Sequence, residues 1–284
     1  MLPVDVAITR FRRDLTIAAL LRTLLLLAAM GCIVAGPVFG LEGNGMFLLM
    51  MVGTIWVILS YRSMQGTRLA ADSPSLIAAR EFDRAESHID AALKTFSLFK
   101  TAKLLSLHHL ALLRHAQNRW RESALLCQAV LSQKLGNLPG LARTTLLILA
   151  DSMLQMGDLQ GAFDAMGRLY RYRLSLNEAL AMQLLQLDYG SRIGAWEPML
   201  QGVGTKVQMS ELMPTLNAAR SQAFLALAAF KSGRTDLGRW LRRRAELLAD
   251  VNEIAAGRPV LQELFGPGME GGSGESVRAS GPTE

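Results

Sequence analysis

The first 61 residues contain two long apolar runs. Residues 23–41 and 43–61 are each 19 residues long without a charged side chain, and only Glu42 lies between them. A helix of that length measures about 28 Å, close to the roughly 30 Å hydrocarbon core of a bilayer. Glycine and asparagine directly after Glu42 favour a tight reversal of the chain. The pattern therefore predicts a transmembrane hairpin of two helices over residues 23–61.

Basic residues before the first run raise the alternative of a cleaved export signal. Arg12 and Arg13 suit such a signal, and Cys32 after Met30 could suggest lipoprotein processing. However, Arg22 interrupts the candidate signal core, and the residues after Cys32 stay apolar. Two buried helices of a soluble core are the other alternative, although the second run has no charged residue to build a polar stripe. A retained hairpin is the favoured interpretation.

Positive charge at the ends of the two runs predicts the orientation. The flanking basic residues are Arg10, Arg12, Arg13, Arg22, Arg62 and Arg68. The turn between the runs has none, so both termini are expected in the cytoplasm, in a membrane of the bacterial inner-membrane type. Residues 1–22 are then a cytoplasmic basic segment, whose Arg10, Arg12 and Arg13 are expected to contact anionic lipid.

After residue 61 the pattern changes to amphipathic helices, and one turn recurs. The five copies occupy residues 79–85, 116–123, 156–162, 194–199 and 232–238. Their closing residues are separated by 38, 39, 37 and 39 positions. A fixed period of this size is the signature of a helical repeat protein.

These units resemble the tetratricopeptide repeat, a helix-turn-helix unit of 34 residues. The third unit carries the likeness best, with Leu149-Ala150 in the first helix, Gly157 at the turn and Ala162 in the second helix. The resemblance implies an all-α fold in which residues 62–264 form a right-handed α-solenoid of about five helical hairpins.

Some units depart from the family pattern. Ser73-Pro74 falls where the first unit needs its first helix, and the fourth unit has Leu187, Pro198 and Met199 at positions expected to be small or helix-favouring. The longer period predicts extended loops at 135–140 and 201–214. A related helical-hairpin repeat fits the pattern nearly as well.

The resemblance also implies a concave groove, lined by the first helices, that binds a peptide or helix of a partner protein. The candidate groove residues are His108, Leu112, His115, Thr144, Leu147, Asp151, Leu184 and Asp188. His108 and His115 are two turns apart on one helix, so both are expected on this face, beside Asp151 of the next unit.

Composition supports an all-α membrane protein. Half of the 284 residues are hydrophobic, 19% are charged and 6% are aromatic, with a mean hydropathy of +0.23 and a pI near 9.7. Few aromatics favour helices over a β-sandwich, and two cysteines exclude a disulfide framework. Residues 265–284 hold mostly Gly, Pro, Ser and Glu, which predicts a disordered tail.

The excess of basic residues lies in the repeat region, residues 62–264, which contains 25 basic and 18 acidic side chains. Its densest cluster is Lys231, Arg234, Arg239, Arg242, Arg243 and Arg244. This basic patch either attracts an acidic partner or lipid headgroups, or is a solvated helix with its stems packed on a neighbour. No nucleic acid is expected, because no binding motif accompanies the cluster.

Candidate chemistry is sparse. The four histidines lack the spacing of a metal site, and Cys127 is expected to be a small core residue. Residues 202–206 only superficially resemble a phosphate loop, without its G-x-x-x-x-G-K-[ST] spacing. We therefore expect no enzyme activity, no cofactor and no metal.

Two functions remain. The first is a membrane-anchored scaffold whose cytoplasmic groove presents a surface to a partner protein, with a role in assembly, folding or localisation. The alternative is a subunit of a membrane complex in which the transmembrane hairpin is the working part and the solenoid docks it.

Overall fold

A computed structural model describes residues 3–38, 42–97, 99–135 and 138–266. Over these ranges the protein is all-helical and contains no strand, which confirms the predicted class. The chain divides into two compact units, residues 1–152 and 153–284, and the division falls inside one helix. Each unit is described by itself below. The predicted tail lies almost wholly outside the described residues.

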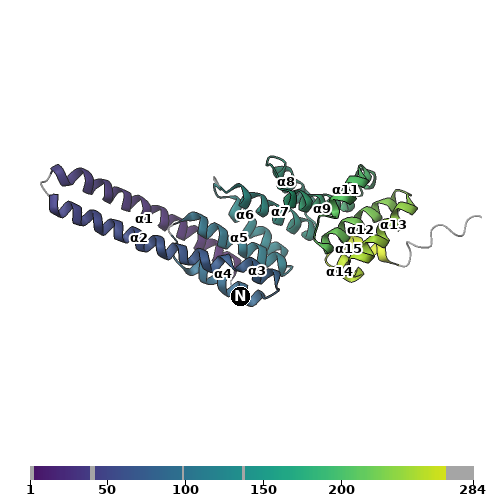
Figure 1. The fold of residues 1–284 in the computed structure, drawn as a ribbon, viewed down its shortest axis with the longest axis horizontal. Helices are drawn as coiled ribbons and strands as arrows, with labels where there is room; N and C mark the ends of the chain where they lie inside the picture. The colour runs from purple at the N-terminus through teal and green to yellow at the C-terminus, as the bar shows by residue number, and fades with distance from the viewer. Residues whose placement is uncertain (1–2, 39–41, 98, 136–137, 267–284) are drawn as a thin grey trace, which may run out of the picture. The chain divides into compact units, whose positions relative to one another are not determined.

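Within its described residues, unit 1 contains six helices and the first part of a seventh. They are α1 (Val4–Val38), α2 (Glu42–Ala71), α3 (Ser73–Ala78), α4 (Phe82–Lys94), α5 (Lys100–Ala116), α6 (Trp120–Leu131) and α7 (Pro139–Met156). In Figure 1, α1 and α2 lie side by side and extend well beyond α3–α6. Both are longer than the predicted spans, because each continues into the packed part of the unit.

Helix α1 has two halves with different surroundings. In the first half Val4, Ala7, Phe11 and Ala18 are buried at spacings of three, four and seven, the pattern of a stripe that packs on one side. Helix α1 contacts α5 and α6, and Asp14 in this half pairs with Lys103 of α5. The predicted basic segment 1–22 is therefore not separate from the apolar run, since a single helix contains both.

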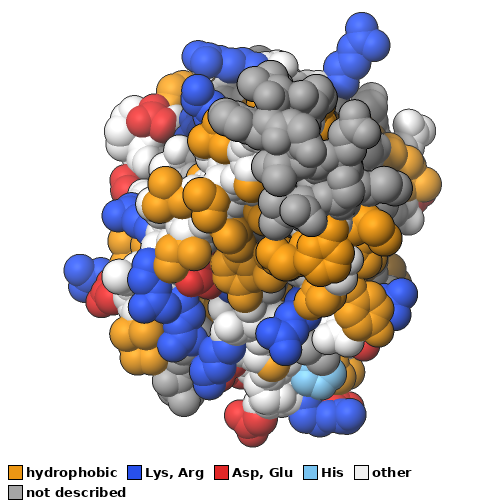
Figure 2. Space-filling model, turned by 90° about the vertical axis from the view of Figure 1, so that its left-hand side faces the viewer, with side chains coloured by type: hydrophobic (Ala, Val, Ile, Leu, Met, Phe, Trp, Pro, Cys, Tyr) orange, Lys and Arg blue, Asp and Glu red, His pale blue; other side chains and the backbone are white. Residues whose placement is uncertain are grey.

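The second half of α1 presents apolar side chains outward. Its exposed residues include Leu20, Leu24, Leu26, Leu27, Met30 and Ile33. In the described part of the chain, Val4–Gly31 is the one stretch long and apolar enough to cross a membrane, and only 11% of its 18-residue apolar window is buried. Figure 2 shows hydrophobic side chains on the face at this end of the molecule.

Helix α2 also exposes apolar side chains along its length. Those described include Phe47, Met50, Val57, Ile58 and Tyr61. Residues 39–41 of the predicted turn lie outside the described residues, as do several α2 side chains. The crossing of a membrane by both helices stays a prediction.

The recurring turn has the same backbone geometry in all five copies. A residue with positive φ follows each first helix: Arg80 and Asn118 in unit 1, and Gly157, Gly194 and Gly233 in unit 2. At every copy its N–H donates three residues back, and the next N–H donates five residues back. These are the paired bonds of the Schellman motif, which satisfies the last carbonyls of a helix. The predicted repeat of this turn is confirmed.

Small residues follow the turn where two helices meet closely. Ala85, Ser123 and Ala162 are fully buried, and the Ser123 hydroxyl donates to the Ala111 carbonyl at 3.0 Å. At Gly238, an added Cβ would lie 2.9 Å from the Phe230 ring. The helix pairs can approach only because these positions carry little or no side chain.

The described residues of unit 2 form the end of α7 and eight further helices. They are α8 (Leu159–Leu169), α9 (Leu176–Arg192), α10 (Trp196–Leu200), α11 (Val203–Ser210), α12 (Thr215–Lys231), α13 (Thr235–Leu248), α14 (Val251–Ala255) and α15 (Pro259–Phe265). Its core lies around α12, which is buried from Ser221 to Ala229. The predicted loop at 201–214 is wrong, because α11 forms there after a break at Gly202, whose φ is +62°.

Helices of consecutive pairs contact each other at a constant sequence offset. His109 bonds the Ala70 carbonyl 39 residues earlier, and His108 contacts Thr145, 37 residues later. In unit 2, Gln183 and Ser221 are 38 residues apart and 3.5 Å from each other. The end of α2 therefore packs against α5 in the same way as α5 packs against α7. It supplies much of the first helix that Ser73-Pro74 seemed to remove from the first unit.

Candidate functional site

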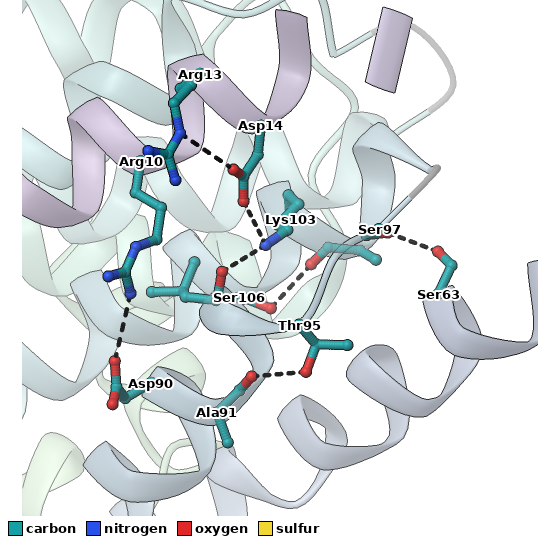
Figure 3. Close-up of polar contacts among 12 residues, drawn as sticks. Arg10, Arg13, Asp14, Ser63, Asp90, Ala91, Thr95, Ser97, Lys103 and Ser106 are labelled. Carbon is teal, nitrogen blue, oxygen red and sulfur yellow. Dashed lines mark hydrogen bonds and ion pairs between the residues drawn. The ribbon is translucent and has the colours of Figure 1, made fainter. Parts of the chain in front are cut away.

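A buried ion pair joins α1 to α5. The Lys103 side chain is only 2% exposed, and its Nζ donates to Asp14 Oδ2 at 2.8 Å (Figure 3). It also donates to the Leu93 carbonyl at 2.5 Å. A buried ammonium needs such partners, because an unpaired buried charge is very costly. The Leu93 carbonyl belongs to the end of α4, where helical partners run out. Lys103 thus holds three helices together.

Two arginines lie on α1 beside this ion pair. The Arg10 guanidinium is 3.9 Å from Asp90, and the Arg13 guanidinium is 3.9 Å from Asp14 (Figure 3). Each of these carboxylates has a lysine closer to it: Lys94 is 2.5 Å from Asp90, and Lys103 is 2.8 Å from Asp14. The arginines are therefore the more distant partners of both carboxylates.

A hollow of about 340 Å³ opens on this face of α1. Its lining residues are Asp5, Val6, Thr9, Arg10 and Arg13. Nη1 of Arg10 is buried and makes no hydrogen bond within the described residues. Arg12, predicted with them as a lipid contact, is exposed on another side of α1 and does not line the hollow.

Hydroxyl groups tie α2 to the segment before α5. The hydroxyls of Ser63 and Ser97 are 2.6 Å apart and buried (Figure 3). Ser97 also donates to the Phe99 carbonyl at 3.0 Å. The C-terminal part of α2 is thus fixed by hydrogen bonds at Ser63 and at the Ala70 carbonyl.

His108, predicted in the groove, is instead buried between α5 and α7. It is 8% exposed, and its Nδ1 lies 2.9 Å from the Thr145 hydroxyl. That hydroxyl donates to the Leu141 carbonyl, so Nδ1 of His108 carries the hydrogen. Burial, followed by the nearby charge of His109, lowers the pKa of His108 to about 4. His108 is consequently a neutral packing residue at neutral pH.

His115 and Asp151 form the contact predicted between neighbouring units. His115 Nε2 lies 2.9 Å from Asp151 Oδ2, and the imidazole meets the Trp120 ring edge-on at 4.9 Å between centroids. Leu112, Thr144 and Leu147 are half-buried. Since His108 and His115 meet α7 at nearly the same offset, α5 and the first part of α7 run parallel, and these side chains share one surface of unit 1.

The two remaining groove candidates lie in unit 2. Leu184 is half-buried and packs against the core. Asp188 is only 1% exposed and pairs with Arg192 at 2.7 Å and with Arg258. Its carboxylate holds α9 to the segment before α15, so it is not presented to a partner.

The basic patch is largely balanced by acidic neighbours. Carboxylates lie within 3.1 Å of five members, in the pairs Lys231–Glu263, Arg234–Glu197, Arg239–Asp236, Arg242–Glu246 and Arg244–Glu211. Arg244 also stacks over Trp240 at 4.9 Å. These contacts favour the interpretation of a solvated, packed helix over an anion-binding patch.

The sequence analysis rejected residues 202–206 as a phosphate loop and gave Lys206 no other role. It follows the break at Gly202, and its Nζ donates to the Met199 carbonyl at 2.8 Å, at the end of α10. A cleft of about 250 Å³ beside it is lined by Gln186, Tyr189 and Ile193, among others. Burial lowers the pKa of Lys206. Its main role in this geometry is to satisfy carbonyls where the second helix of the fourth pair is interrupted.

Groups that could carry catalysis or hold a metal are few. In the part of the chain that the structure describes, no three His, Cys, Asp or Glu side chains converge as metal ligands would. Cys127 is buried, as predicted, and burial raises the pKa of its thiol to about 12.

The fold and surfaces define an all-helical protein with an apolar N-terminal helix and recurring helix pairs. Comparison with known protein families, curated proteins and solved structures found no match to the chain. Function is therefore inferred from the chain's own surfaces.

Proposed function

We propose that this protein is a membrane-anchored interaction scaffold. Its first two helices hold it in a bilayer, and a tetratricopeptide-like array of helix pairs binds a partner protein on the cytoplasmic side. The observation that carries the proposal is the row of exposed apolar side chains on α1, continuous with a packed helical unit. Such a row is unfavourable in water and favourable in hydrocarbon. The proposed activity is binding, without a catalytic residue or cofactor.

The repeated turn supports the array. Five Schellman turns at nearly constant spacing, with buried small residues after them, are what a series of stacked helix pairs requires. The parallel alignment of α5 with α7 is the arrangement expected of first helices in successive repeats. The partner surface we propose is the exposed side of these two helices, around Leu112, His115, Leu147 and Asp151.

Site-specific photo-crosslinking in native membranes tests the partner surface. A photoreactive phenylalanine analogue is placed at Leu112 or Leu147 in the full-length protein. The matched control is the same analogue at Leu125, which is 42% exposed on the second helix α6. We expect one discrete crosslinked protein from the two first-helix positions and none from the control. Crosslinks of equal yield and identity from Leu125 would contradict the proposed surface.

One observation favours the alternative of a working transmembrane pair. Helix α1 runs without interruption from the apolar half into the buried contacts of Phe11 and Asp14, so the two membrane helices are firmly attached to unit 1. Replacing residues 20–38 and 42–60 with unrelated apolar helices of equal length separates the two functions. A scaffold tolerates this exchange and keeps its crosslinked partner, whereas a working subunit loses the activity of its complex although the partner still binds.

A further inference from the structure

We propose that an exposed surface of unit 2 binds an acidic protein segment that carries an apolar side chain. The surface consists of the arginine turn, residues 168–173 at the end of α8 and just after it, and of the cleft that adjoins α9. It is separate from the partner surface proposed on α5 and α7, and it needs no contribution from the membrane helices.

The arginine turn carries three positive charges without a neighbouring carboxylate. Arg168, Arg171 and Arg173 are exposed, and among the described residues none of their guanidinium groups forms an ion pair or a hydrogen bond. The basic patch is different, because carboxylates lie within 3.1 Å of five of its members. Unbalanced positive charge on one turn attracts a negatively charged partner.

The two carboxylates nearest in sequence to the arginine turn have other partners. Asp164 accepts a hydrogen bond from Gln160 Nε2 at 2.9 Å. Glu178 is buried and forms the capping box of α9 with Ser175. The three guanidinium groups therefore stay available to carboxylates of a partner.

Tyrosines lie between these arginines in the sequence. Tyr170 is 68% exposed and Tyr172 is 38% exposed. The Tyr170 hydroxyl accepts a hydrogen bond from Gln186 Nε2, which holds its ring beside α9. Tyrosine and arginine are enriched among the residues that dominate protein–protein binding. The turn thus has the composition of a protein-binding surface.

The side of α9 that holds Tyr170 leads to an apolar cleft. Gln186 and Tyr189 on α9 and Ile193 at its end follow one another at spacings of three and four, and all three line the cleft of about 250 Å³. Among the described residues that line it, none is acidic. Ile193 is 50% exposed. The cleft has room for one apolar side chain of a partner.

The distribution of charge favours a protein segment over a nucleic acid or a lipid surface. The cleft has a single basic side chain, Lys206, whose Nζ donates to the Met199 carbonyl at 2.8 Å. A nucleic acid needs basic side chains along its whole path, because its backbone is charged throughout. A flat bilayer surface cannot enter a cleft. An acidic segment with one apolar side chain matches both parts of the surface.

Selection from a random peptide library tests the kind of partner. The library is displayed on phage and selected on the purified full-length protein. We expect enrichment of peptides in which Asp or Glu residues lie next to an aromatic or aliphatic one. Fluorescence anisotropy then measures the binding of one enriched peptide. R168Q/R171Q/R173Q should bind it about tenfold more weakly, because three charge pairs are lost. Ile193→Glu should also weaken it, because a carboxylate then lies in the cleft.

Matched variants separate this surface from the rest of the protein. R234Q/R239Q/R243Q removes three exposed arginines from α13 and the turn before it, and should bind the peptide as the wild type does. R168K/R171K/R173K keeps the charge and should bind more tightly than the glutamine variant, which excludes a general loss of folding. Leu112→Ser changes the surface proposed on unit 1 and should leave this peptide bound, so the failure of either surface is recognised separately.

Three results would overturn the proposal. The first is enrichment of peptides without acidic residues, and the second is equal weakening of binding in R234Q/R239Q/R243Q. The third comes from two competing probes, labelled single-stranded RNA and short-chain phosphatidylglycerol. If either binds more tightly than the selected peptide and loses that binding in R168Q/R171Q/R173Q, the arginine turn is a phosphate-binding surface and not a site for an acidic protein segment.

Discussion

Lys103 shows what a single buried polar residue does in this protein. Its partner Asp14 is 89 residues earlier in the sequence, so no local pattern could have predicted the pair. Asp14 lies inside the predicted basic segment 1–22, and the sequence analysis gave it no role of its own. By contrast, the contact of His115 with Asp151 was predictable, because the repeat period brings equivalent positions of successive units together.

Removing the carboxylate from this ion pair should be strongly destabilising. Asp14→Asn leaves the Lys103 ammonium buried without its counter-charge, and we expect a loss of about 3 kcal/mol in the free energy of unfolding. The double variant Asp14→Leu/Lys103→Met removes both charges and should be more stable than Asp14→Asn. Thermal unfolding in detergent measures both. A double variant as unstable as the single one would show that the ion pair does not have this role.

His108 should make the protein less stable in acid. Its folded pKa of about 4 lies below its unfolded value of 6.5, so the unfolded state binds more protons between these values. Stability is then complete above pH 6.5 and falls as the pH drops toward 4, by up to about 3 kcal/mol from this group. His108→Gln should reduce the slope of stability against pH.

At the scale of elements, the five turns were predictable and the fourth pair was not. The residue types predict the turns, because three of the five positive-φ positions are glycine and one is asparagine. In the fourth pair the large and small partners are exchanged: Gly190 in the first helix faces Met199 in the second. An added Cβ at Gly190 would lie 2.9 Å from Met199. This compensation between helices cannot be seen from either helix alone.

Substitutions at the turns should change stability in opposite directions. Arg80 adopts a φ of +62°, which costs an L-residue about 1 kcal/mol, so Arg80→Gly should raise the free energy of unfolding by up to that amount. Gly233→Ala should lower it by about 1 kcal/mol for the same reason. Gly167→Ala in the last turn of α8, where an added Cβ meets nothing within 4 Å, should be neutral or slightly stabilising. Chemical unfolding of the three variants compares them, and a destabilising Arg80→Gly would contradict this account of the turns.

At the scale of the whole molecule, the sequence predicted the helical class and the apolar N-terminal region, but not where the second helix ends. It predicted a boundary at residue 61, whereas α2 continues to Ala71 and its end packs on α5 through His109. It predicted one continuous array over 62–264; the chain divides into two compact units between residues 152 and 153, and the continuity of the array stays a prediction. The later end of α2 arises from long-range packing. The sequence shows where the apolar run ends, but it does not show that the same helix continues and packs against α5.

The central claim is that α1 and α2 hold the protein in a membrane with both termini on the same side. Cysteine labelling of intact cells with a membrane-impermeant maleimide tests it most directly. Cys32 is replaced by alanine, and Cys127 can stay because its buried thiol, with a pKa of about 12, does not react. The account predicts that Asn44→Cys is labelled in intact cells and Ser273→Cys only after permeabilisation. Labelling of Ser273→Cys from outside, or protection of Asn44→Cys, would contradict it.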